Sequence, residues 1–315
     1  MNILIIGKDT QLLWPQHVKD ACDNLGHKNK LFLFNNLGIA DTVRSFAKKI
    51  SPALSEKFVA RQLKKSLEKF KPDVVILISA FFIPESLYEA VLDYKKALII
   101  GWSGDGFDKT VESKAQACNK LYCTDSFFVE RALSYDWAQT SYLPLAFNEK
   151  IFYKLPNNIR NNEIVFIGNP DKNRTNIVDN IKTPLSLVGP KWNLPNNTVH
   201  SVIKKSISIN EVARLYHNSF GVLNIKQESN VVNGLNMRSF EAPACGALLI
   251  HDNVKDLKRH YISSEEVVVY DSISNLNDIL SEIYIDTKKY EKIARQGQER
   301  CLSEHTYTHR LKNIL

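Results

Sequence analysis

The chain has 315 residues, of which 44 % are hydrophobic and 24 % charged, and its formal net charge is +7. This length suits two domains of ordinary size, and the composition excludes disordered, collagenous and membrane-spanning classes. No hydrophobic run reaches the length of a bilayer span, and the N-terminus lacks the basic flank and cleavage site of a secretory signal, so we expect a cytoplasmic protein. The spacing of the five cysteines matches neither a zinc site nor a disulfide framework, so they are expected to be reduced.

Hydrophobic runs alternate with helical patterns along the chain, which predicts parallel sheets joined by helical crossovers. In the first half, strands are predicted at residues 3–6, 31–34, 74–78, 97–101, 120–124 and 141–143. Helical patterns lie between them, including residues 12–25 and 126–133. The pattern predicts a first Rossmann-like domain over residues 1–150.

The loop after the first strand argues against a nicotinamide dehydrogenase. It begins at Gly7 and lacks the Gly-x-Gly-x-x-Gly spacing of a dinucleotide site, and no suitable acidic residue ends the second strand. Gly7 is instead predicted to let a ligand approach the backbone of a loop in a cleft.

A strongly basic stretch runs from Arg44 to Lys71, with nine basic and two acidic residues. Hydrophobic residues within it recur at helical spacing and predict a helix with a basic outer face: Val59, Leu63, Leu67 and Phe70. One interpretation is a solvated helix face. The other is peripheral contact of residues 57–71 with anionic lipid on the inner face of the membrane, or with a polyanionic acceptor. Nucleic acid is not expected, because no aromatic platform or reader motif accompanies the charge.

After the fourth predicted strand, Asp105 lies between Gly104 and Gly106. A carboxylate at the carboxyl end of a parallel strand projects into a cleft and suits a general base that takes a proton from an acceptor hydroxyl. The alternative is a turn residue whose side chain binds only backbone groups.

An Asn- and Pro-rich segment without periodicity, residues 144–162, is predicted to link two domains. The alternation then restarts, and a second Rossmann-like domain is predicted over residues 151–300. Its strands are expected at residues 163–167, 185–188, 198–199, 220–225, 247–250 and 267–270. Its helices are expected to include residues 174–180, 211–217, 238–245, 276–283 and 288–298.

The first strand of this second domain leads into a glycine turn and a helix start. Gly168 and Asn169 form the turn, and Lys172 and Arg174 lie on the helix, an arrangement that suits a diphosphate clamp. A capped helix with solvated charges is the alternative. The turn at Gly189, after the next strand, is expected to meet a nucleobase.

The segment from residue 234 to residue 252 carries the strongest signal. Asn236, Arg238, Ser239 and Glu241 lie at the start of a short helix of small residues. The helix N-terminus and the arginine suit a diphosphate, and the glutamate can accept both hydroxyls of a ribose, so together they predict a sugar-nucleotide site. An ordinary amphipathic helix with a surface Arg–Glu pair is the alternative.

Several other chemistries are not expected. His251, His260, His305 and His309 show no metal-site spacing, and we expect structural or capping roles for them. The sequence contains neither a Gly-x-Ser-x-Gly elbow nor a phosphate-loop motif, which argues against an α/β-hydrolase and against a nucleotide triphosphatase.

Three ordered motifs, residues 240–250, 266–271 and 305–310, resemble the spore-maturation-type (CgeB-like) glycosyltransferases, relatives of the group-one family. The resemblance implies an α/β chain of GT-B architecture, with two Rossmann-like domains whose parallel sheets face each other across a cleft. It also implies that residues 301–315 form a C-terminal helix that crosses back to the N-terminal domain.

The resemblance further implies a sugar transfer from a nucleotide-diphosphate donor, held by the second domain, to a glycan, glycolipid or protein acceptor held by the first. No metal or other cofactor is expected. Similarity to the fold would put Glu241 on the donor ribose and Arg174, with Lys172 or Arg238, on the diphosphate, completed by N–H groups of residues 236–239.

One departure affects the donor sugar. The group-one pattern has a second glutamate eight residues before the ribose glutamate, and this chain has Asn233 there. The donor sugar and the stereochemical outcome therefore stay open. A nucleotide-sugar epimerase of the same fold and a non-catalytic sugar-nucleotide-binding protein are the alternatives.

Overall fold

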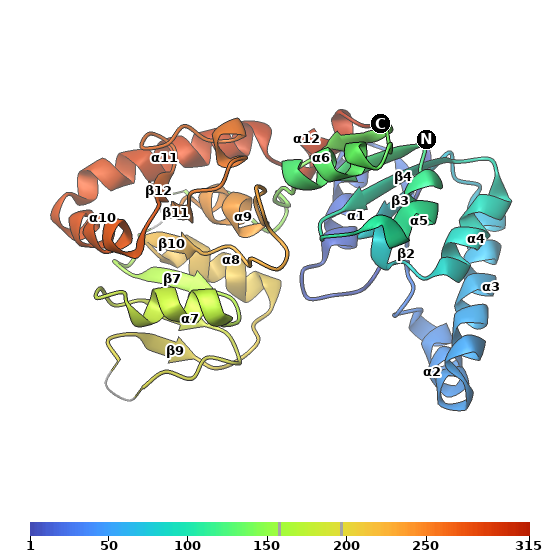
Figure 1. Ribbon diagram of the computed structural model, residues 1–315, viewed down its shortest axis with the longest axis horizontal. Helices are drawn as coiled ribbons and strands as arrows, with labels where there is room; N and C mark the ends of the chain where they lie inside the picture. Colours follow the sequence, from blue (N-terminus) through green and yellow to red (C-terminus); the bar gives the residue numbers. More distant parts are fainter. Residues whose placement is uncertain (157–158, 196–197) are drawn as a thin grey trace. The chain divides into compact units, whose positions relative to one another are not determined.

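The computed structural model describes residues 1–156, 159–195 and 198–315, and it divides into two compact units (Figure 1). The first unit contains residues 1–144 and 310–315, and the second contains residues 145–309. Residues 157 and 158 of the predicted linker lie outside the described residues.

The first unit is built on a six-stranded parallel sheet with helices on both of its faces (Figure 1). Its strand order is β2-β1-β3-β4-β5-β6. The strands are β1 (Asn2–Gly7), β2 (Lys28–Leu33), β3 (Val74–Ile78), β4 (Leu98–Ser103), β5 (Lys120–Cys123) and β6 (Thr140–Tyr142). The helices are α1 (Trp14–Asn24), α2 (Asp41–Ile50), α3 (Pro52–Phe70), α4 (Glu85–Tyr94), α5 (Glu112–Gln116) and α6 (Ser126–Ser134), with 3-10 turns η1 (Gly38–Ala40), η2 (Ala80–Phe82) and η3 (Lys109–Val111).

These strands confirm the predicted positions to within a few residues because β1 and β3 are almost entirely buried hydrophobic runs. Such runs are typical of parallel strands covered on both faces. The chain reverses its direction of winding between β1 and β3, which places the switch point of this sheet at the carboxyl ends of those two strands.

The basic stretch contains two helices, α2 and α3. Ser51 is extended and Pro52 begins α3, because proline is favoured in the first turn of a helix and cannot continue the preceding one. As predicted, Val59, Leu63 and Leu67 of α3 are buried in the core of the unit.

The second unit has a six-stranded parallel sheet in the order β12-β11-β10-β7-β8-β9. Its strands are β7 (Ile164–Ile167), β8 (Ser186–Val188), β9 (Ser201–Ile203), β10 (Gly221–Asn224), β11 (Leu248–Asp252) and β12 (Val268–Tyr270). Its helical elements are α7 (Lys172–Asp179), α8 (Ile209–Asn218), α9 (Arg238–Ala244), η4 (Leu257–Arg259), α10 (Ile273–Ile285), α11 (Thr287–Glu304) and α12 (Tyr307–Lys312), which ends in the first unit. This is the Rossmann strand order, and its switch point lies between β7 and β10.

One strand prediction for this sheet is wrong. The edge strand β9 lies at residues 201–203, whereas the sequence predicted residues 198–199. No residue of β9 is buried, so the hydrophobic pattern that located the other strands is missing here.

The last six residues of the chain complete the first unit. Leu311 and Ile314 are buried, the Arg310 guanidinium donates to the Pro144 carbonyl oxygen at 3.2 Å, and Lys120 Nζ donates to the Ile314 carbonyl oxygen at 3.2 Å. The first unit is therefore made from two separate parts of the sequence.

Candidate functional site

The predicted donor residues of the second unit gather at its topological switch point. Gly168 and Asn169 follow β7, and Arg174 lies on α7 and is buried. The Arg174 guanidinium donates to the Ile225 carbonyl oxygen through Nε and Nη2, at 3.3 and 3.0 Å, and to the Asn169 carbonyl oxygen through Nη1, at 3.0 Å. Arg174 thus joins the carboxyl end of β7 to that of β10, where open α/β sheets bind ligands.

Arg238, the first residue of α9, spans the same gap from the other side. Its Nη1 donates to Asn224 Oδ1 at 2.6 Å, and its Nη2 donates to the Ile167 carbonyl oxygen. The guanidinium carbons of Arg238 and Arg174 lie 5.4 and 5.5 Å from the ring centroid of Phe166. Two cations therefore share one aromatic ring at the switch point.

This pair of cations is incompletely neutralised. Burial, and then the neighbouring charge of Arg238, lower the pKa of Arg174 to about 10. The nearest carboxylate to Arg174 is that of Asp171, at 3.6 Å, and Arg238 has no ion-pair partner among the described residues. Because like charges repel, an anion bound here would relieve an unfavourable interaction.

Glu241 lies one turn into α9 and is 6 % exposed. Burial raises the pKa of its carboxyl group to about 8, although the charge of Arg238 opposes that shift. Within the described residues its carboxylate accepts no hydrogen bond. A buried acidic group with unused acceptors beside a cation is suited to a neutral diol.

Free backbone amides lie at the entrance to α9. The amides of Ser239, Phe240 and Glu241 already donate to the carbonyl oxygens of residues 236 and 237. Those of Asn236, Met237 and Arg238 donate to no group in the part of the chain that the structure describes. Three consecutive amides of this kind, at the residues that lead into α9, are groups that can donate to an anion.

A buried polar network fixes the side chains of Asn236 and Ser239 at this segment. Asn224 Nδ2 donates to Ser239 Oγ at 2.9 Å, and Asn236 Nδ2 donates to Asn224 Oδ1 at 2.9 Å. Ser239 Oγ also lies 2.9 Å from His251 Nε2, and the other ring nitrogen of His251 lies 2.9 Å from an Asp252 carboxylate oxygen. The Ser239 side chain is fully buried, so it supports the site and does not line it.

The two glycine turns are in direct backbone contact. A Cβ atom on Gly189 would lie 2.3 Å from the Gly168 carbonyl oxygen, so no other residue fits at position 189 without moving the loop. Trp192 is buried, and its indole N–H donates to the same carbonyl oxygen at 2.8 Å. Trp192 therefore anchors the Gly168 turn. Lys172 is exposed at the start of α7, on the chain segment that follows this turn.

In the first unit, Asp105 lies just beyond the carboxyl end of β4 and is half-buried. Burial raises the pKa of its carboxyl group. The Asp105 carboxylate accepts no hydrogen bond from the described residues, whereas Asp108 accepts one from the Thr110 amide at 2.9 Å. The turn-capping role considered for Asp105 thus belongs to Asp108.

Packing within the first unit explains why residue 7 is a glycine. A Cβ there would lie 2.5 Å from Cγ of Pro15, so glycine allows the first turn of α1 to pack on the end of β1. The neighbouring Trp14 ring would contact a Cβ on Gly104 at 3.1 Å, which places α1 beside the loop that carries Asp105.

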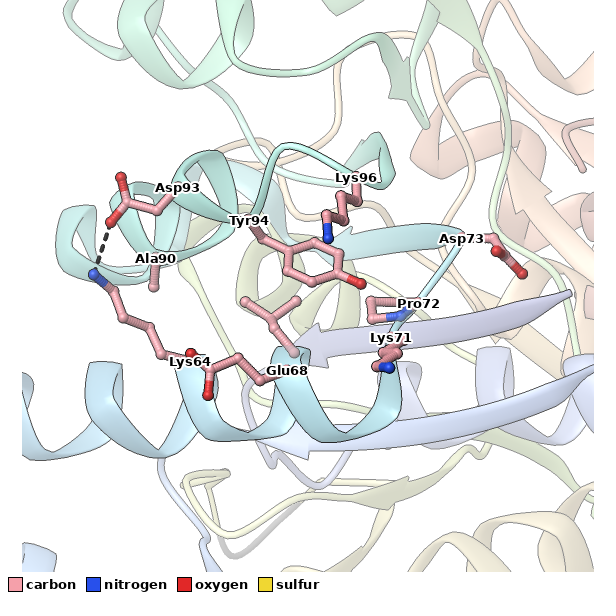
Figure 2. Close-up of a pocket in the computed structure, with 10 residues that line it drawn as sticks. Lys64, Glu68, Lys71, Pro72, Asp73, Ala90, Asp93, Tyr94 and Lys96 are labelled. Carbon is pink, nitrogen blue, oxygen red and sulfur yellow. Dashed lines mark hydrogen bonds and ion pairs between the residues drawn. The ribbon is translucent and has the colours of Figure 1, made fainter.

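A hollow of about 540 Å³ lies elsewhere on the first unit, between α3 and α4 (Figure 2). Asp73 lines this hollow and directly precedes β3, so the hollow lies at the amino ends of the strands. Gly7 and Asp105 lie at the opposite, carboxyl ends. Its lining contains three lysines and three acidic residues, and Lys64 pairs with Asp93 at 2.7 Å. None of the predicted site residues lines it.

The described residues contain no group of three His, Cys, Asp or Glu side chains placed to hold a metal ion. Two residues that the sequence analysis missed are central to the site: Asn224, at the buried end of β10, and Phe166 in β7. The signal for Asn224 was a polar residue at the end of a hydrophobic strand. Phe166 has no signal, because a strand aromatic is indistinguishable from ordinary core.

Residues 173–315 match a protein family described as glycosyl transferase-like. No curated protein matches the sequence.

Solved structures match over nearly the full chain. A glycosyltransferase from Rickettsia africae is 10 % identical with a TM-score of 0.71, covering 99 % of this chain and 96 % of its own. The Anabaena protein HepE in complex with UDP-glucose is 11 % identical with a TM-score of 0.70, covering 100 % and 98 %. A putative UDP-N-acetylglucosamine 2-epimerase from Listeria monocytogenes is 11 % identical with a TM-score of 0.56, covering 96 % and 94 %. At these identities the likeness concerns the fold, and it confirms the predicted GT-B class.

Proposed function

We propose that this protein is a glycosyltransferase that moves a sugar from a nucleotide-diphosphate donor to a glycan, glycolipid or protein acceptor without a metal ion. The observation that carries the proposal is the convergence of Arg174, Arg238 and Glu241 at the switch point of the second sheet. The family match over residues 173–315 and the UDP-glucose bound to HepE support the same donor class.

Each group of the second unit has a proposed role in holding the donor. Arg174, Arg238 and the amides of residues 236–238 hold the diphosphate, with Lys172 able to reach it from α7. Glu241 accepts the two ribose hydroxyls. The backbone at Gly168 and Gly189 contacts the base. As the bond between the sugar and the diphosphate breaks, the cations stabilise the charge that develops on the leaving group.

In the first unit, Asp105 is proposed to take the proton of the acceptor hydroxyl. The acceptor oxygen then forms a bond to the anomeric carbon, the bond to the diphosphate breaks, and the nucleoside diphosphate leaves. A carboxylate with a raised pKa and free acceptor atoms is suited to this role, because a base works best when its pKa approaches the working pH.

Thermal denaturation tests donor binding directly. A ligand that binds only the folded protein raises the melting temperature, so one of UDP, GDP, dTDP, ADP or CMP should raise it. UDP is the first choice because HepE is known in complex with UDP. If none of these nucleotides shifts the transition at millimolar concentration, the proposed donor site is wrong.

Replacing Asp105 by asparagine should reduce transfer by roughly 100-fold or more, which is the usual contribution of a general base. Nucleotide affinity should be unchanged, because the substituted residue does not belong to the second unit. Asp108→Asn is the matched control: it lies on the same loop, is exposed, and should retain transfer. Normal transfer by Asp105→Asn would show that the base is another group.

An epimerase is the second candidate, favoured by the likeness to the Listeria protein. Epimerisation inverts one centre of the donor sugar and needs no acceptor. Incubation with a nucleotide sugar alone separates the two: a new nucleotide sugar indicates epimerisation, whereas transfer requires an added acceptor.

A further inference from the structure

Helix α2 exposes a hydrophobic stripe. Val43, Phe46 and Ile50 recur at helical spacing and are 52, 65 and 62 % exposed. No residue of α2 is buried, and the helix packs mainly against α3, at the end of the arm that these two helices form in Figure 1. A contiguous apolar stripe on an outer helix indicates a surface that binds something.

The side of α2 that lies closest to its neighbours is different in character. Asp41, Arg44 and Ala47 recur at intervals of three and are only half-exposed, and Arg44 is paired with Asp41 at 2.5 Å. The apolar stripe is therefore not a core-facing side of α2 that has been left partly uncovered. It is the outward face of a helix whose polar and small residues make the inner contacts.

The same segment carries almost all of the net charge of the protein. Residues 41–71 contain nine basic and three acidic residues, which gives +6 of the total +7. Five of these cations have no ion-pair partner among the described residues: Lys48, Lys49, Lys57, Arg61 and Lys65. A partner for this surface must therefore combine negative charge with an apolar layer.

Helix α3 continues the surface. Leu54 is 47 % exposed, and Arg61 and Lys65 follow at seven and eleven residues, which places all three on one face. That face is opposite to Val59 and Leu63, which are buried in the core. Apolar and basic side chains are thus interleaved along both helices, as in helices that lie at a membrane surface.

We propose that α2 and the outer face of α3 dock on an anionic phospholipid bilayer. Phe46, Ile50 and Val43 enter the boundary between headgroups and acyl chains, and the lysines bind the lipid phosphates. Charge complementarity favours this occupant over a neutral protein groove or a second copy of this basic face, either of which would bury the stripe but leave five cations uncompensated. The structure describes no helix that is long and apolar enough to cross a membrane. The hollow of Figure 2 has a balanced lining and plays no part.

Sedimentation of the full chain with lipid vesicles tests the proposal. Vesicles of phosphatidylcholine with about 30 % phosphatidylglycerol should bind the protein, and vesicles of phosphatidylcholine alone should not. Binding should fall at about 0.5 M salt, which screens the attraction. Two variants should each weaken binding by about tenfold or more: Phe46→Ser with Ile50→Ser, and Lys57→Glu with Arg61→Glu and Lys65→Glu.

Matched substitutions in the second unit control for general loss of hydrophobicity or charge. Ile159→Ser with Ile285→Ser removes side chains that are 92 and 84 % exposed. Lys288→Glu with Lys292→Glu and Arg295→Glu reverses three exposed cations of α11. Both controls should bind vesicles like the unaltered protein.

Several outcomes would overturn the proposal: no binding to anionic vesicles, equal binding to neutral ones, or full binding by the α2 and α3 variants. If the protein forms a dimer in solution and the double variant Phe46→Ser with Ile50→Ser is monomeric, the stripe serves self-association instead. Nucleotide affinity should be the same in all of these variants, so failure here is distinguishable from failure of the proposed donor site.

Discussion

Replacing Arg238 by leucine is expected to weaken binding of the donor nucleotide by roughly 30- to 900-fold, because a desolvated charged contact contributes about 2–4 kcal/mol. Arg238 has no ion-pair partner among the described residues, and its charge lies beside both Arg174 and Glu241. The fold should tolerate the change, since Asn224 Oδ1 keeps the hydrogen bond from Asn236. Isothermal titration with the nucleoside diphosphate measures the effect.

Arg160→Leu is the control for this experiment. Arg160 is also partly buried in the second unit, but its guanidinium donates to the carbonyl oxygens of residues 216, 217, 219 and 245. Its loss should lower the melting temperature and leave nucleotide affinity intact. Arg238→Lys should fall between Arg238→Leu and the unaltered protein, because it keeps the charge but not the planar fork. Unchanged affinity in Arg238→Leu would remove this residue from the diphosphate site.

The substitution Glu241→Gln is expected to reduce nucleotide affinity and yet stabilise the folded protein at pH 8. A neutral amide accepts from the ribose hydroxyls through one oxygen only, so the loss should be roughly 10- to 100-fold. Stability should rise because the variant no longer has to ionise a buried carboxyl group. Residues selected for binding often cost stability in this way.

The pH dependence follows from the direction of the shift. The folded-state pKa of Glu241 is about 8, above the value of about 4.3 in an unfolded chain. Between these values the folded state keeps a proton that the unfolded state has lost. The stability of the unaltered protein therefore falls as pH rises through this window, by up to about 1.4 kcal/mol per pH unit. Urea denaturation at pH 5 and pH 8 should show the variant gaining mainly at pH 8.

Glu211→Gln should change stability in the opposite direction to Glu241→Gln, because the pKa of Glu211 is lowered in the folded protein. The Glu211 carboxylate accepts from the Ser208 amide at 2.8 Å and hydroxyl at 2.9 Å, and these bonds lower its pKa to about 2. Its contribution to stability is present above the unfolded pKa and is lost as pH falls toward 2. This variant should therefore be less stable than the unaltered protein at pH 8. If Glu241→Gln also loses stability at pH 8, the buried carboxyl is compensated by a contact that outweighs its burial.

The fold was largely predictable because parallel strands such as β3 are continuous hydrophobic runs with helical patterns between them. The edge strand β9 was not, because nothing in it is buried. The division of the basic stretch into two helices at Ser51 could have been predicted from Pro52, because proline favours the first turn of a helix. The exposure of α2 could not be predicted, because Val43, Phe46 and Ile50 have the spacing that is typical of a helix facing the core.

The candidate site was predictable as far as its charged residues. Strand-end positions and a helix start identified Arg174, Arg238 and Glu241. The two arginines donate to backbone carbonyl oxygens of distant residues, Ile225 and Ile167, and the sequence gives no sign of which carbonyl groups these are. Ser239 was predicted to bind the donor through its backbone N–H group, but that group donates to the Asn236 carbonyl oxygen, and the Ser239 hydroxyl is bonded to the side chains of Asn224 and His251.

The contribution of residues 310–315 to the first unit has a consequence for biosynthesis. The ribosome makes the N-terminal sheet first, but Leu311 and Ile314, which are buried and belong to the same unit, are made only after residues 145–309 of the second unit. Domains generally fold as they are synthesised. The first unit must wait until residues 310–315 have been made before its final hydrophobic contacts form, so a nascent chain that lacks them holds a nearly finished first unit with an open flank.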